Sequence, residues 1–163
     1  MGIEQIKNII GGLEKNIRVK ALKVLAVEAE MSVRKNFDVG GRPAWKPSKK
    51  SKRNKGTKTL VISGALKNVS AISDDAGVKL VIDPRARAYA EIHQFGGVIN
   101  RAAGKVKLRK TAGGSRFASS KHKKYKEVER KAYQINIPAR PYLNIPTEDY
   151  PKILESVKMA ITL

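Results

Sequence analysis

The sequence has 163 residues, of which 41% are hydrophobic, and it contains no cysteine. This length and apolar content predict one compact domain over residues 1–163 with a hydrophobic core. The absence of cysteine excludes disulfide bonds and thiolate metal sites. No window approaches the roughly 18 apolar residues of a membrane span, and the first residues lack the apolar region of a signal peptide. We therefore expect a soluble, unexported protein without a membrane partner.

Basic charge is concentrated in two segments. The chain carries 34 Lys and Arg against 14 Asp and Glu, for a formal net charge of +20. Residues 42–58 hold eight basic side chains, residues 101–126 hold ten, and neither segment holds an acid. Segments so rich in Lys, Gly and Ser bury too little apolar surface to offset the entropy lost on ordering. We expect mobile basic loops at about 42–58 and 98–126, attached to a nearly neutral body.

The N-terminal third has the pattern of an amphipathic helix. Apolar residues recur mostly every three or four positions from Ile6 to Val33. Gly11 and Gly12 interrupt the pattern, and each glycine costs a helix about 1 kcal/mol relative to alanine. We expect a short helix up to Ile10 and a long one over about 13–36, or one bent helix.

A hairpin and a short helix are expected in the middle of the chain. Ser63 could cap a single helical turn through Asn68. The β-branched segments VSAISD and GVKLVID, with turn residues between them, predict an antiparallel hairpin. Pro84 suits the first turn of the following helix, and Gly96 and Gly97 supply the positive φ that ends it.

The C-terminal part predicts one strand and one helix. Residues 132–137 have strand character, and Pro138 and Pro141 stop the strand. Thr147 is expected to cap a helix that continues through Met159. The predicted fold class is therefore α+β: a small antiparallel sheet packed with a long N-terminal helix, a short central helix and a C-terminal helix, with two long basic loops.

His93 and Glu91 are the obvious candidates for catalysis, but their spacing argues against it. Residues two apart on a helix face away from each other, so these side chains would not share a ligand or a proton. The sequence has no HExxH, no GxSxG and no phosphate-binding GxxxxGK[ST] motif. We expect a non-enzymatic protein without cofactor or metal, in which His93 has a structural role.

The basic segments allow two interpretations. They are solvated loops, or they neutralise phosphates of a nucleic acid or acidic faces of a protein. Few aromatic residues accompany the lysines, so stacking on bases is not supported. Trp45 also has two interpretations: it anchors the base of its loop on the body, or it is an exposed partner contact. The candidate partner or polyanion contacts are Trp45, Lys49, Lys50, Lys52, Arg53, Lys105, Lys107, Arg109, Lys110, Lys121, Lys123 and Lys124.

Four phrases occur in an order that is typical of one family: GGRPAWKPSKKSK, LVISGALKNVS, YAEIHQFGG and IPARPYLNIP. With them the chain resembles the phage virion morphogenesis family, the tail-completion proteins of tailed bacteriophages and prophages. In that family Gly-x-Pro-x-Trp-x-Pro, Ser-Gly-x-Leu, Tyr-Ala-x-x-His-Gln-x-Gly and Pro-Ala-Arg-Pro-(Phe/Tyr)-Leu segments recur. All four are present within residues 41–143.

The resemblance implies a structural protein at the head-proximal end of the tail, which completes the tail and makes it competent to join the filled capsid. Related neck proteins work as rings, so we expect a homo-oligomer, with a hexameric ring as one candidate, and other tail and neck proteins as partners. The implied location is the virion, and the host cytoplasm during assembly. The chain departs from the family in its two lysine-rich loops, which leaves nonspecific nucleic-acid binding open as the alternative function.

The third and fourth of these phrases suggest a structural junction. We expect the helix that contains Tyr89 to stop at its glycines, and residues 138–143 to return beside it. The Arg140 guanidinium could then bond to helix-terminal carbonyls or to a carboxylate such as Glu91. The residues proposed for this junction are Tyr89, His93, Gln94, Gly96, Arg140 and Pro141.

Overall fold

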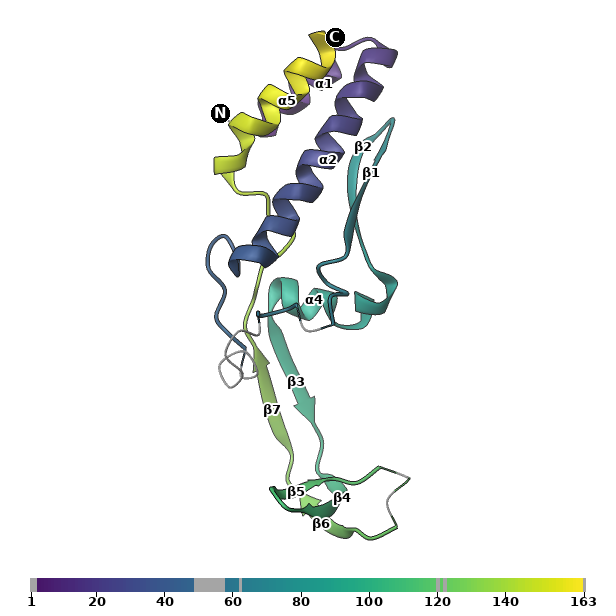
Figure 1. Cartoon of the computed structure of the whole chain (residues 1–163), viewed down its shortest axis with the longest axis vertical. Helices are drawn as coiled ribbons and strands as arrows, with labels where there is room; N and C mark the ends of the chain where they lie inside the picture. The colour runs from purple at the N-terminus through teal and green to yellow at the C-terminus, as the bar shows by residue number, and fades with distance from the viewer. Residues whose placement is uncertain (1–2, 49–57, 62, 120, 122, 163) are drawn as a thin grey trace. The chain divides into compact units, whose positions relative to one another are not determined.

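The computed structural model describes residues 3–48, 58–61, 63–119, 121 and 123–162. Their contacts group the chain into two compact units: residues 1–96 with 138–163 form the first, and residues 97–137 form the second. The predicted α+β fold class is confirmed, because helices occur together with small antiparallel sheets (Figure 1). That the two units behave as one domain stays a prediction. No helix among the described residues is both long and apolar enough to cross a membrane.

Three helices form one half of the core of the first unit: α1 (Ile3–Gly11), α2 (Lys15–Val39) and α5 (Tyr150–Thr162). The predicted break at the paired glycines is confirmed, and α2 ends at Gly40, whose φ of 83° lies in the left-handed region. The apolar faces of the three helices share one buried cluster, made of Ile6, Ile10, Ala21, Leu22, Ile153, Leu154 and Val157.

A hairpin packs on the same long helix. Strands β1 (Val69–Asp74) and β2 (Gly77–Ile82) pair in antiparallel register, as the sequence predicts. One face of the hairpin contributes Val69 to a second buried cluster, which Phe37 of α2 shares. The helical turn expected before β1 is only a hydrogen-bonded turn, in which the N–H of Asn68 donates to the carbonyl of Gly64 (3.0 Å).

A short 3₁₀ turn, η1 (Pro84–Ala86), leads into α4 (Arg87–Phe95). The predicted place of Pro84 in the first turn is confirmed, and Asp83 caps this turn because its carboxylate accepts from the Arg85 N–H (2.8 Å). The predicted cap of the last helix is wrong. Thr147 lies inside the 3₁₀ turn η2 (Thr147–Asp149), which is preceded by Pro146 and has no side-chain cap.

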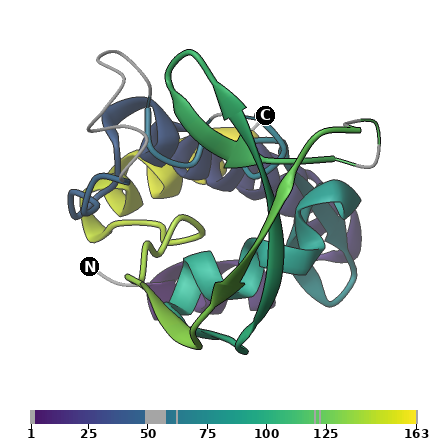
Figure 2. The same ribbon diagram turned by 90° about the horizontal axis from the view of Figure 1, so that it is seen from below.

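The second unit consists of two small sheets (Figure 2). One pairs β3 (Gly97–Arg101) with β7 (Tyr133–Ile137), and the other has the order β5-β4-β6. Its strands are β4 (Gly104–Thr111), β5 (Gly114–Phe117) and β6 (Lys126–Arg130). The sequence predicted only the strand now seen as β7.

The prediction of a loop over residues 98–126 is therefore wrong in its secondary structure, because most of this range forms the strands β3, β4 and β5. Val106 and Leu108 alternate with lysines along β4, which is the period-two pattern of a strand. The density of positive charge obscured this pattern. Whether these strands move in solution stays a prediction.

Candidate functional site

The proposed junction residues lie together in the first unit. The backbone N–H of Arg140 donates to the carbonyl of His93 (2.8 Å), and the N–H of Leu143 donates to Oε1 of Gln94 (3.2 Å). Helix α4 ends at Gly96, whose φ is 76°. The returning segment thus satisfies a carbonyl in the last turn of α4, where helical partners are missing.

The side chain of Arg140 has a different partner from the helix-terminal carbonyls and the Glu91 carboxylate that the sequence analysis proposed. Its Nε donates to the carbonyl of Lys46 (3.0 Å), whereas Glu91 is exposed on α4. Arg140 is only 4% exposed. The reason for the difference is that the stretch after α2 passes over Arg140 and presents a carbonyl there. Arg140 therefore joins three segments, because its backbone bonds α4 and its guanidinium bonds the stretch after α2.

His93 lies half-buried beside this junction. Its ring meets the Tyr89 ring edge-on at a centroid distance of 5.9 Å. Burial lowers the pKa of His93, and the positive charge of Arg140 lowers it further. Its Nδ1 is buried and has no hydrogen-bond partner among the described residues. This environment favours a neutral imidazole that packs within the fold.

Trp45 anchors the stretch after α2 in the core. It is 7% exposed, and its ring meets Phe37 edge-on at 5.4 Å. Gly41, with a φ of 105°, lies so close to the indole that a Cβ at this position would overlap it. The proposal of Trp45 as a partner contact is therefore wrong for this structure, because the exposed surface that a partner would need is absent.

Arg42 holds an ion cluster that the sequence analysis missed. Its Nη1 lies 3.0 Å from Oε1 of Glu148 and 2.8 Å from Oδ2 of Asp149. Its Nη2 donates to the carbonyl of Ser32 (2.7 Å), and its Nε donates to Oδ1 of Asn36 (2.8 Å). The Arg42 side chain is only 11% exposed, so this residue belongs to the folded body and not to a mobile loop.

The cluster connects distant parts of the first unit. Burial alone would raise the pKa of Asp149, but hydrogen bonds from Ser32 and Arg42 and the charge of Arg42 outweigh it, so the pKa lies below its ordinary value. Asn36 Nδ2 donates to the carbonyls of Tyr142 (3.0 Å) and Asn144 (2.7 Å). Helix α2, the segment before η2, and η2 itself are thereby joined. A single arginine beside two glycines is not a sequence pattern from which the role of Arg42 in this cluster could be predicted.

The basic residues proposed as contacts differ in their placement. Lys49, Lys50, Lys52 and Arg53 lie outside the described residues. Lys105, Lys107 and Lys110 are exposed on β4, Arg109 is half-buried there, and Lys121, Lys123 and Lys124 are exposed before β6. By strand register Glu129 lies opposite Lys105 and Glu127 opposite Lys107, and Lys107 Nζ is 3.8 Å from Glu127 Oε1. Acids therefore offset part of the positive charge on this face of β4.

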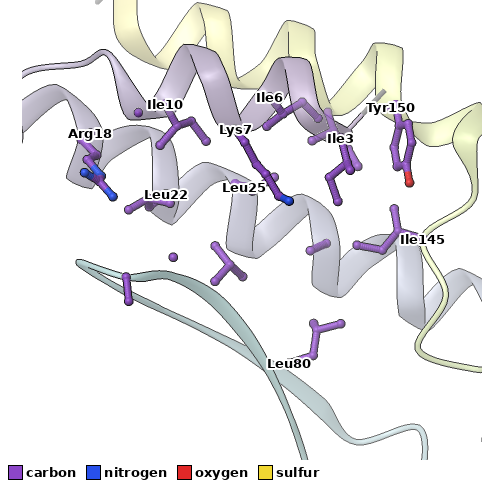
Figure 3. A pocket seen from close by; sticks show the side chains of 16 residues that line it. Ile3, Ile6, Lys7, Ile10, Arg18, Leu22, Leu25, Leu80, Ile145 and Tyr150 are labelled. Carbon is purple, nitrogen blue, oxygen red and sulfur yellow. The ribbon is translucent and has the colours of Figure 1, made fainter. Parts of the chain in front are cut away.

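The first unit also contains an apolar groove of about 460 Å³ between α1, α2 and the hairpin (Figure 3). Two cations reach it, but both have partners: Lys7 Nζ lies 2.8 Å from Glu4, and Arg18 Nη2 donates to the carbonyl of Asp75 (3.0 Å). Small-molecule sites orient their ligand by convergent polar groups. The groove lacks such a set, and no group of three or more His, Asp or Glu suited to a metal occurs among the described residues.

Comparison with known proteins identifies the family. The profile of the phage virion morphogenesis family matches residues 2–162. The chain belongs to this family. It is also 30% identical over 142 residues to a protein of Haemophilus influenzae called Mu-like prophage FluMu G protein 2, covering 86% of this chain and 76% of the relative. No solved structure matches significantly.

The four phrases of this virion morphogenesis protein converge in one buried cluster. Trp45 comes from the first phrase, Leu66 from the second, Ala90 from the third and Tyr142 from the fourth. Tyr142 is 1% exposed and contacts Phe37 with a ring centroid distance of 5.6 Å. The residues that carry the resemblance thus build a core rather than line an open site.

Proposed function

We propose that this protein completes the phage or prophage tail at its head-proximal end and makes the tail competent to join the filled head. The family match over residues 2–162 and the prophage relative support a role in virion assembly. The convergence of the four phrases in one buried core carries the proposal, because shared residues used for packing suit a scaffold better than a reaction site. The protein acts in this account by binding and not by catalysis.

Its proposed partners are other copies of itself and other tail and neck proteins of the virion. A homo-oligomer, with a hexameric ring as one arrangement, would give the tail a closed end. The protein would be made in the host cytoplasm and remain in the virion. The second unit, with its exposed cations, supplies one surface for these contacts.

Deletion of the gene from its phage or prophage tests this function. Electron microscopy of the lysate should show filled heads and separate tails, and supplying the protein in trans should restore joined virions. Normal virions without the protein would contradict the proposal, and so would a complete loss of tails, because the protein would then be needed for the tail itself.

Nonspecific nucleic-acid binding is the second candidate function. Residues 97–137 hold twelve Lys and Arg against two acids, which favours contact with phosphates. Duplex binding by the purified protein should then weaken steeply with salt, with a slope of about −0.9 per phosphate contact on a log–log plot. Binding that is undetectable at physiological salt would remove this candidate and leave the structural function.

A further inference from the structure

The second unit has strands but no core of its own. No described residue between positions 97 and 137 is buried, although both sheets carry aliphatic side chains. Two- and three-stranded sheets need an apolar face packed against something else for stability. A phosphate backbone does not provide such a covering, whereas another protein surface does.

One face of the sheet β5-β4-β6 is suited to this packing, and we call it the docking face. In the register of the strands, Val106 lies opposite Val128 and Leu108 lies opposite Phe117, so the four side chains share one face. Phe117 is 71% exposed. The docking face is therefore an apolar patch that an aromatic side chain extends toward solvent.

Positive charge surrounds this patch. Strand alternation places Lys110, Lys126 and Arg130 on the docking face, and places both acids of the three strands, Glu127 and Glu129, on the opposite face. Two docking faces would repel each other across the patch. The chemistry that fits is a protein surface with an apolar centre and carboxylates beside it.

The chain itself carries a surface of that kind in its first unit. One face of the β1–β2 hairpin packs into the core, and the other presents Ile72 and Val81, which are 54% and 39% exposed. Asp74 shares this outer face and Asp75 follows in the turn, whereas Lys79 is the one cation that alternation places there, already paired with Asp74 (2.9 Å). We call this surface the outer hairpin face.

We propose that the docking face of one copy packs on the outer hairpin face of a second copy. The contact is a sheet on a sheet, in which Phe117 and Leu108 cover Ile72 and Val81, and Lys126 and Arg130 lie near the carboxylates of the turn. The two surfaces differ, so the contact is head-to-tail and closes into a ring if the rotation between copies permits. The inference deepens the proposed function, because it rests on the self-association assumed there.

Disulfide trapping tests the contact directly, because the chain has no cysteine of its own. Full-length Phe117→Cys protein is mixed with full-length Ile72→Cys protein, and oxidised heterodimer is measured over time. The matched control is Arg116→Cys, which neighbours Phe117 but lies on the opposite face of β5. We expect the Phe117 pair to cross-link at least about tenfold faster than the Arg116 pair. Equal rates, or no cross-link in either mixture, would overturn the proposal.

A second measurement uses no introduced cysteine, because a cysteine can itself disturb the contact. Sedimentation of Phe117→Ser protein, whose altered side chain is exposed in the single chain, should show a dissociation constant of the oligomer raised at least about tenfold relative to the unmodified protein. An unchanged oligomer would overturn the proposal. Loss of duplex DNA binding by Phe117→Ser with the oligomer intact would overturn it in favour of a nucleic-acid surface.

The gene-deletion experiment separates this inference from the proposed function. If cross-linking fails while deletion still leaves heads and tails unjoined, the docking inference is wrong and the function stands. If cross-linking succeeds while deletion leaves normal virions, the contact is real and the proposed function is wrong.

Discussion

Phe37 and Phe117 belong to the same chain but lie in opposite surroundings. Phe37, in the first unit, is fully buried between Trp45 and Tyr142, whereas Phe117, in the second, is 71% exposed. The first unit also contains buried polar groups with defined partners, such as Arg42 and Arg140. The first unit therefore has a core of its own, whereas the described residues of the second unit bury none of their side chains, and in the contact proposed above the second unit gains its packing from a partner.

The two phenylalanines give the largest expected contrast. Phe37→Ala should lower the free energy of unfolding by about 3–5 kcal/mol, because it removes a buried ring from the core. Phe117→Ala should change it by less than about 0.5 kcal/mol in the dilute protein, because the ring is exposed. Urea denaturation followed by circular dichroism measures both. A large loss for Phe117→Ala would show that the second unit has a core within the single chain.

Two arginines provide a contrast of intermediate size. Arg42→Ala removes the cation 2.8 Å from the partly buried Asp149 and leaves it Lys35, whose Nζ lies 3.9 Å away, so it should cost about 2–4 kcal/mol of folding free energy. Arg116→Ala, on an exposed strand of the second unit, should stay within about 0.5 kcal/mol. The same denaturation experiment applies, and equal effects at the two positions would contradict the structural role assigned to Arg42.

Two glycines test the anchoring of Trp45. Gly41→Ala should cost about 1–3 kcal/mol, because its φ is 105° and the new Cβ would displace the indole. Gly11→Ala should be neutral or slightly stabilising, because no atom lies near its Cβ position and alanine favours helix. Thermal melts of the two variants check the pair. A neutral Gly41→Ala would mean that Trp45 is not held as the structure shows.

His93 gives the smallest expected effect, which appears only with pH. Its pKa in the folded protein is lowered, so the unfolded chain takes up the proton first as the pH falls. The contribution of His93 to stability is full above its ordinary pKa of about 6.5 and is lost as the pH falls below it. Unfolding free energies measured between pH 7 and pH 5 should fall less steeply for His93→Gln. An identical slope would contradict the assigned environment.

Regular apolar spacing made much of the first unit predictable. The interrupted helix, the hairpin and the helix that Pro84 begins follow from local patterns of apolar residues, glycine and proline. Local sequence patterns did not predict interactions that depend on residues distant in the chain. From the sequence alone Arg42 is one more charge in a basic run, because its partners Ser32 in α2 and Asp149 in η2 reach it only in the fold.

The second unit was hidden for the opposite reason. Its strands alternate as strands should, but lysines occupy many of the polar positions, so composition indicated a loop. Cross-strand partners such as Glu127 lie too far along the chain for the local charge count to include them. Pairing across strands, and not local composition, decides whether such a segment folds.

Amide hydrogen exchange tests the contrast between the two units most directly. The full-length protein would be compared as a dilute single chain and in its assembled state, with exchange followed peptide by peptide. We predict slow exchange in α2 and α5 in both states, and exchange in β4, β5 and β6 that is fast in the single chain and slow after assembly. Equally strong protection of these strands in the dilute single chain would contradict the account, because the second unit would then not need a partner.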